Sequence, residues 1–294
     1  MKITEGYMPY LEYKTYYRIV GECTGNKKPL LLLHGGPGST HNYFEVLDCL
    51  AEEDGRAIIM YDQLGCGLSA TPSRPDLWTA ETWIEELIAL RKHLGLDEIH
   101  LLGQSWGGMQ AIQYLCDYKP EGITSVILAS TLPAAELWAK EQHRMISYMS
   151  PEEQKAIAVA EESGNFEEPA YVAANAKFME QHCASTPGPD SPDCLRRPKV
   201  SGTEAYVTGW GPNEYNPTGT LKGWEYRDKL HTIQAPTLIT SGLSDLCTPW
   251  IAKLMHDSIA DSEWELFEFS RHMAFVDEPD KYRAVLKKWL NAHD

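Results

Sequence analysis

The chain has 294 residues, which is enough for one large hydrophobic core or for one domain that carries an insertion. Its formal net charge of −16 argues against nucleic acid and anionic membranes as partners, and it fits either a cationic substrate or a solubilising surface. No apolar run is long enough to span a bilayer, and the N-terminus has no pattern typical of an export signal. We therefore expect a cytoplasmic protein whose seven cysteines are reduced thiols.

Strand and helix signals alternate through the first part of the chain. Residues 1–22 are typical of two strands. Further short apolar runs predict buried strands at Pro29–Gly36, Arg56–Gly65, Glu98–Gln104 and Ser125–Ser130. Between them, the spacing of apolar residues predicts helices at Thr82–Leu94 and Met109–Tyr118. Strands that alternate with helices indicate a mostly parallel central sheet with helices on both faces.

From Leu132 to about Tyr215 the sequence has helix signals and no convincing strand. Ser150, Pro151 and Glu153 match a capping box with proline at the first helical position. Residues 186–198 are rich in Pro, Asp and Ser and predict a loop. The segment is acidic, with thirteen Asp and Glu against seven Lys and Arg between residues 134 and 215.

Strand signals then return at Ala235–Gly242 and Trp264–Ser270, and a last helix is predicted near Tyr282–Leu290. We interpret this order as a sheet core of residues 1–132 and 216–294. Residues 133–215 are predicted to form a helical cap inserted into that core.

Gly103-Gln104-Ser105-Trp106-Gly107 matches G-x-S-x-G, and the motif lies between a predicted strand and a predicted helix. This context is what the nucleophile elbow of the α/β-hydrolase fold requires, because a tight strand-to-helix turn exposes the serine at a helix N-terminus. The expected fold class is therefore an α/β-hydrolase fold with a mostly parallel sheet and an inserted helical cap. Ser105 is the predicted nucleophile.

A serine needs a base, and the base needs an orienting acid. In this fold the chain order is serine, acid, histidine. Asp245 follows one predicted strand and His272 follows the next, so both are expected at the sheet edge that carries Ser105. We predict Ser105, Asp245 and His272 as the triad. No His, Cys, Asp and Glu cluster has metal-ligand spacing, so no metal or other cofactor is expected.

His34-Gly35-Gly36-Pro37-Gly38 follows the first buried strand, at the place of the loop that supplies half of an oxyanion hole. The predicted oxyanion donors are the backbone N–H groups of Gly36 and Trp106. Asp62 follows the next strand, and because the triad is already complete we interpret it as structural.

Taken together and in order, HGGPG, YDQLGCG, GQSWGGM, GPNEY and SDLCTP closely resemble the proline iminopeptidases, in particular those of lactic acid bacteria. The resemblance covers essentially the whole chain. It implies the α/β-hydrolase core, the helical cap, the same triad, and release of an N-terminal residue, usually proline, from peptides. It also implies that Glu214 of the GPNE segment holds the free α-amino group of the substrate.

Other parts of the substrate site are expected from the same resemblance and from composition. Gly35 is expected to contact the substrate, and Trp106, Trp210 and Tyr215 are expected to wall an apolar slot for the proline ring. Leu246 stands where some relatives carry a second glutamate. Recognition of the amine therefore depends on Glu214, or on another cap acid such as Glu204.

The predicted activity is that of a serine aminopeptidase that acts on short peptides or amino-acid amides with a free N-terminus, without a nucleic-acid or membrane partner. An L-amino-acid amidase or small-molecule esterase on the same triad is the first alternative, because the triad chemistry is shared. A ligand-binding protein that keeps the fold without turnover is the second, and an intact triad argues against it.

Overall fold

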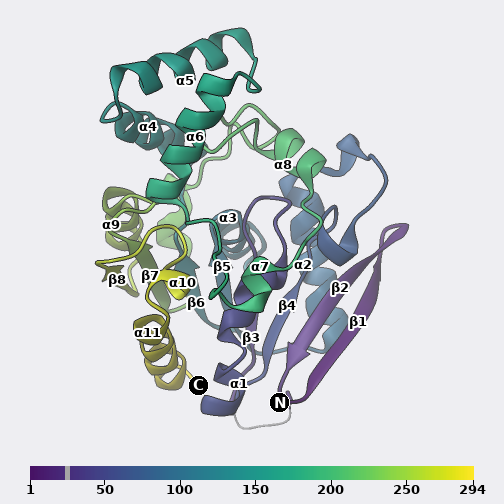
Figure 1. The fold of residues 1–294 in the computed structure, drawn as a ribbon. Helices are drawn as coiled ribbons and strands as arrows, with labels where there is room; N and C mark the ends of the chain where they lie inside the picture. Colours follow the sequence, from purple (N-terminus) through teal and green to yellow (C-terminus); the bar gives the residue numbers. More distant parts are fainter. Residues whose placement is uncertain (24–26) are drawn as a thin grey trace.

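The computed structural model describes residues 1–23 and 27–294 (Figure 1). Its centre is an eight-stranded sheet with the order β1-β2-β4-β3-β5-β6-β7-β8. The pairs β1–β2 and β2–β4 are antiparallel, and all other neighbours are parallel. The strands are β1 (Ile3–Tyr10), β2 (Tyr13–Val20), β3 (Leu30–Leu33), β4 (Ile58–Tyr61), β5 (Ile99–Gln104), β6 (Ile123–Ala129), β7 (Thr237–Gly242) and β8 (Ser262–Phe267). The mostly parallel sheet predicted from the sequence is confirmed.

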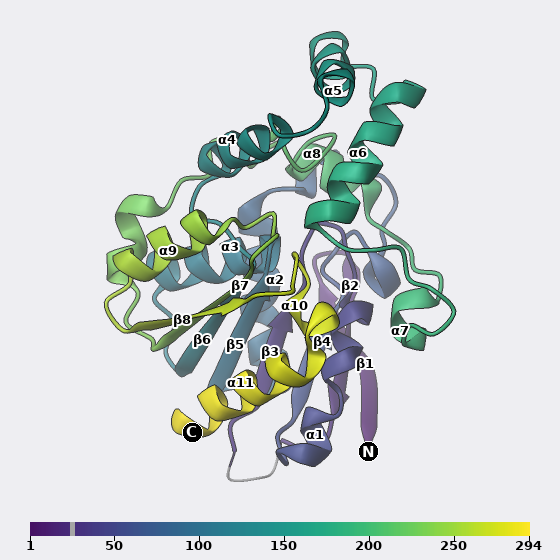
Figure 2. The same ribbon diagram turned by 60° about the vertical axis from the view of Figure 1, so that its left-hand side comes forward.

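The four-residue strands β3 and β4 have an apolar or aromatic residue at every position because both faces of the sheet are covered. Successive side chains of a strand point to opposite faces. In β3, Leu31 and Leu33 belong to one buried cluster, whereas Leu30 and Leu32 belong to the other. Figure 2 shows helices α2, α3 and α9 on one side of the sheet and α1, α10 and α11 on the other. This is the predicted layered arrangement.

The helices of these two layers agree closely with the sequence pattern. Helix α2 covers the whole predicted range and starts two residues earlier, and α3 starts at Trp106 and continues as a π-helix over Tyr114–Tyr118. The bounds are α1 (Leu50–Glu53), α2 (Ala80–Leu94), α3 (Trp106–Gln113), α9 (Pro249–Ser258), α10 (Ala274–Asp277) and α11 (Pro279–Ala292). Among the described helices, none is both long and apolar enough to cross a bilayer.

Between β6 and β7 the described chain has no strand, but it has a short 3₁₀-helix and five α-helices. The α-helices are α4 (Ala135–Ile146), α5 (Pro151–Ser163), α6 (Pro169–His182), α7 (Asp193–Arg196) and α8 (Thr203–Gly209). Four of them stand above the carboxyl edge of the sheet (Figure 1), whereas α7 lies lower beside the segment His41–Leu47 (Figure 2). The capping box predicted at Ser150 is confirmed, because its side chain and that of Glu153 each accept from the other's backbone N–H. The exact limits of the cap, residues 133 and 215, stay a prediction.

One detail of the cap differs from the sequence interpretation. Residues 186–198 were expected to be a loop throughout, but the single-turn helix α7 lies within them. Pro192 stands at its N-cap and Asp193 in its first turn, which favours a helix start. Leu195 packs against the buried cluster beneath α11, and this tertiary contact is not visible in local composition.

Candidate active site

Ser105 stands on a tight turn between β5 and α3. Its backbone φ is 56°, a region that costs a non-glycine residue about 1–3 kcal/mol. The two motif glycines are required by close approach: a Cβ on Gly103 would collide with the backbone of Gly107, and a Cβ on Gly107 would collide with the backbone of Leu33. The spacing of the motif therefore follows from the packing of α3 against β3 and β5.

The predicted acid and base meet at the same edge of the sheet. Asp245 follows β7 and His272 follows β8, and His272 Nδ1 lies 2.7 Å from Asp245 Oδ1. Both side chains are buried. This contact leaves Nε2 as the ring nitrogen that can take a proton from Ser105. Within the described residues His272 makes no hydrogen bond to Ser105, a contact that often forms only when substrate is bound.

Residues of the predicted cap contact His272 through its ring and through its backbone. The His272 ring packs edge-on against Trp138 of α4, with centroids 5.8 Å apart. Its backbone N–H donates to the carbonyl of His182, at the end of α6. The position of the base is therefore coupled to two helices of the predicted cap.

Ser105 and His272 open into one cavity of about 360 Å³. It extends from the loop after β3 to the helices of the predicted cap. Its lining is Gly35, Gly36, Pro37, Gly38, Ser39, Tyr43, Gln104, Ser105, Cys183, Ser201, Gly202, Thr203, Tyr206, Glu214, His272 and Met273. The size suits one or two amino-acid residues of a substrate.

The loop after β3 is braced from behind. The Gly35 N–H donates to the Tyr43 hydroxyl at 2.6 Å, and that hydroxyl donates to Gln104 Oε1 at 2.9 Å. Gly35 lines the cavity, but its N–H already donates to Tyr43 and is not available to a ligand. Gly36 and Trp106 donate from the backbone to no other group of the described residues, so both N–H groups are available for an oxyanion.

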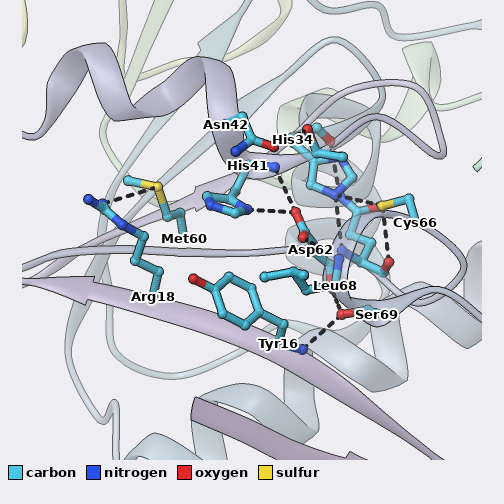
Figure 3. A network of polar contacts seen from close by, with 12 residues as sticks. Tyr16, Arg18, His34, His41, Asn42, Met60, Asp62, Cys66, Leu68 and Ser69 are labelled. Carbon is cyan, nitrogen blue, oxygen red and sulfur yellow. Dashed lines mark hydrogen bonds and ion pairs between the residues drawn. The ribbon is translucent and has the colours of Figure 1, made fainter. Parts of the chain in front are cut away.

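A buried polar network beside this loop explains Asp62 (Figure 3). Its carboxylate accepts from the backbone and Nδ1 of His41, at 2.8 and 2.7 Å, and from the Leu68 N–H at 2.8 Å. Asp62 does not line the cavity. The network ties the loops after β3 and β4 together, which supports the structural interpretation of Asp62.

His34 makes the second link in that network (Figure 3). Its Nε2 accepts from the Gln63 N–H at 3.0 Å, and its carbonyl accepts from Gln63 Nε2 at 2.9 Å. Burial lowers the pKa of His34 from 6.5 to about 4, so the ring is neutral near pH 7. The neutral His34 side chain therefore holds the loop after β3 against the loop after β4.

Protonation of His34 is expected to destabilise the fold in mild acid. Between pH 6.5 and 4, His34 binds a proton in the unfolded chain but not in the folded chain. The free energy of unfolding is therefore highest above pH 6.5 and decreases as the pH falls through this range. The contribution of His34 lowers the free energy of unfolding by about 2 kcal/mol between pH 7 and pH 5. Urea unfolding at both pH values should show a smaller loss for His34→Asn than for the wild type, and equal losses would contradict this account.

Glu214 is the acidic group of the cavity. It accepts a hydrogen bond of 2.7 Å from the Tyr206 hydroxyl, and its backbone carbonyl accepts from Trp138 Nε1. Burial raises the pKa of the Glu214 carboxyl, and the nearby His272 partly offsets this effect. A carboxylate in such a place gains strongly from a cation brought by a ligand.

The alternative cap acid, Glu204, lies outside the cavity lining. Its carboxylate accepts from Trp78 Nε1 at 2.7 Å and from the Arg74 N–H at 2.9 Å. Leu246 is fully buried. Of the two cap acids considered from the sequence, only Glu214 lines the cavity that holds Ser105. No group of three metal-ligating side chains is found in the part of the chain that the structure describes.

The three aromatic residues expected to wall the cavity are not part of its lining. The Trp106 indole turns into the core against Trp83, with centroids 5.2 Å apart, and donates to Gln63. Trp210 is 3% exposed, and the Tyr215 ring packs on Phe178 while its hydroxyl donates to Asn175. The structure therefore places these rings in the core, and their proposed contact with a proline ring stays a prediction.

Other residues form the walls instead, namely Pro37, Tyr43, Cys183, Tyr206 and Met273. No sequence pattern singled out Cys183 or Met273. Tyr206 lies eight residues before Glu214 on the neighbouring helix α8, and Met273 directly follows His272. Proximity in sequence to the predicted site residues is a signal that could have found Tyr206 and Met273, but it does not apply to Cys183.

Comparison with known proteins agrees with this geometry. Residues 28–279 match the family model described as alpha/beta hydrolase fold. A proline iminopeptidase of Clostridium botulinum is 73% identical, and one of Lactobacillus helveticus is 60% identical, each with 100% of both chains covered. The solved proline iminopeptidase of Mycobacterium smegmatis superimposes with a TM-score of 0.87 at 29% identity, covering 99% of this chain and 98% of that one. The chain belongs to the proline iminopeptidase family of α/β hydrolases.

Proposed function

We propose that this chain is a serine aminopeptidase that releases the N-terminal residue, preferentially proline, from short peptides. The observation that carries the proposal is one cavity that holds Ser105, His272 and the partly buried acid Glu214. The first two supply acyl-transfer chemistry, and the third supplies a site for a terminal ammonium. The names of the similar proteins support the same activity.

The reaction follows from the positions of these groups. The substrate amine binds Glu214, and Ser105 attacks the first peptide carbonyl while His272 takes the hydroxyl proton. The backbone N–H groups of Gly36 and Trp106 stabilise the oxyanion, each by about 2.7–4 kcal/mol. His272 then protonates the leaving amine. Water hydrolyses the acyl-enzyme by the reverse proton route, and Ser105 is regenerated.

We also propose that residues 133–215 act as a cap that sets specificity. They contribute Cys183, Tyr206 and Glu214 to the cavity, whereas the sheet edge contributes Ser105 and His272. The partly buried Glu214 carboxylate is costly to desolvate further when it has no cation partner, so substrates without a terminal ammonium are disfavoured. Amino-acid amides carry the same ammonium and are expected to enter as well.

The proposed function is tested with a panel of p-nitroanilides of proline, alanine and leucine, with prolinamide and N-acetylprolyl p-nitroanilide beside them. We expect the highest kcat/KM for the prolyl anilide and no measurable turnover of the acetylated compound. A clear preference for prolinamide would assign the chain to the amidases, and activity on esters alone would make it an esterase. Equal turnover of free and acetylated anilides would contradict an aminopeptidase.

Glu214→Gln is expected to raise KM for prolyl p-nitroanilide about 10- to 100-fold, because a hydrogen bond to a charged group is lost. Hydrolysis of p-nitrophenyl acetate, which has no amine, should change less than about threefold. Glu204→Gln is the matched control, since that acid belongs to the same segment but lies outside the cavity. Similar losses on both substrates would mean that Glu214 is structural.

A further inference from the structure

Ser130 lies between the predicted nucleophile and the predicted acid, at the carboxyl end of β6. In the sheet, β6 pairs with β5, which leads to Ser105, and with β7, which leads to Asp245. Ala129 is in register with Gln104 on one side and with Thr240 on the other. The residues that follow Ala129 therefore reach both parts of the triad.

Two consecutive hydroxyl groups use this position. Ser130 Oγ donates to Asp245 Oδ2 at 2.6 Å, and Thr131 Oγ1 donates to the carbonyl of Ser105 at 2.6 Å. Both residues are buried. The end of β6 thus contacts the acid with one side chain and the nucleophile elbow with the next.

The carboxylate of Asp245 receives two hydrogen bonds on each oxygen. Oδ1 accepts from His272 Nδ1 at 2.7 Å and from the Cys247 N–H at 2.9 Å. Oδ2 accepts from Ser130 Oγ at 2.6 Å and from the Gly242 N–H at 3.0 Å. Apart from His272, Ser130 is the one side chain among the described residues that donates to this carboxylate.

The backbone of Ser130 shows that the hydroxyl is held there against a local cost. Its φ is 49°, a left-handed conformation that glycine adopts freely and serine adopts at a cost. The backbone is fixed there by the Ser130 N–H, which donates to the Thr240 carbonyl at 2.8 Å. A serine at a position better suited to glycine indicates a use for its side chain.

We propose that Ser130 is a positioning residue for the hydrolytic reaction: its hydroxyl fixes the rotation of the Asp245 carboxylate and thereby the orientation of His272. Without it, Oδ2 retains a single backbone donor and the carboxylate can turn away from the imidazole. Ser130 acts through Asp245, and it does not line the substrate cavity. The inference rests on the proposed serine-hydrolase function.

The test uses the full chain and prolyl p-nitroanilide. Ser130→Ala removes the hydroxyl, and Ser130→Gly removes it while relieving the backbone at φ 49°. Ser125→Ala is the matched control, because Ser125 is a buried serine of the same strand whose hydroxyl contacts His100 and Trp289 at the opposite end of the sheet. Unfolding midpoints of all variants separate loss of stability from loss of rate.

We expect both Ser130 variants to lose about 10-fold or more in kcat with KM within about twofold of wild type. The acid limb of the kcat/KM profile should move to higher pH, since a carboxylate with fewer donors attracts the imidazole proton more strongly. The other titratable groups around the pair, Glu214, Cys183 and Cys247, are unchanged in these variants. Ser125→Ala should be less stable but keep the wild-type kcat and profile.

Three results would overturn the proposal. A folded Ser130→Ala enzyme with wild-type kcat would show that the hydroxyl does not position Asp245. Wild-type kcat in Ser130→Gly alone would assign the effect to backbone strain. A wild-type protein that hydrolyses no anilide or ester would contradict the proposed function itself, and the inference would fall with it.

Discussion

Ser105→Ala is expected to lower kcat for prolyl p-nitroanilide by about 10⁶-fold, the loss typical of removing a triad nucleophile. Ser105 is the proposed site of the acyl-enzyme, so the remaining activity should come from binding and the oxyanion donors alone. The variant should fold, because alanine adopts the strained turn no less easily than serine. Kinetics with purified protein and a thermal unfolding curve check both points.

Residual activity of a few per cent in Ser105→Ala would contradict the assignment, provided that contamination by wild type is excluded by mass spectrometry. Loss of activity together with loss of folding would not separate chemistry from structure. Ser105→Gly serves as the second variant here, since glycine accepts the φ of 56° without strain.

Asp245→Asn is expected to lower kcat about 10⁴-fold with little change in KM. Asparagine keeps the shape of the side chain, but its amide favours the wrong tautomer of His272 and stabilises the imidazolium less. It also turns a donor toward groups that now donate to the carboxylate, such as the Gly242 N–H. The measurement is kcat and KM on prolyl p-nitroanilide with the unfolding midpoint determined in parallel.

The chain offers a matched control for this variant. Asp62 also accepts from a histidine Nδ1 at 2.7 Å, in this case from His41, and is equally buried. Because that pair lies outside the cavity, Asp62→Asn should cost stability while kcat changes far less than in Asp245→Asn. Equal losses of kcat would mean that both variants act by disturbing the fold.

The parts of the molecule that were predictable from the sequence are those with strong local signals. Leu30–Leu33 and Ile58–Tyr61 are continuous apolar runs because both faces of the sheet are covered, so the central strands could be recognised. The predicted triad follows from chain order and from strand ends, which determine which side chains reach the sheet edge. His272 and Asp245 do lie together as expected.

The parts that were not predictable depend on the direction in which a side chain points. Trp106, Trp210 and Tyr215 have the apolar character that a proline pocket needs, but the same character suits a core, and the structure uses all three there. Ser130 belongs to no motif, and its contact with Asp245 arises only from the pairing of β6 with β7. Local sequence carries no information on such contacts.

Covalent labelling with a diphenyl phosphonate analogue of proline, used with a free amine and in N-acetylated form, tests the proposed roles of Ser105 and Glu214 together. An activated serine displaces phenoxide from phosphorus and forms a stable phosphonate ester. We predict one label per chain, mapped to Ser105 by peptide mass spectrometry, and much faster labelling by the free amine because of Glu214. Labelling at another residue, no labelling, or equal rates for the two reagents would contradict these roles.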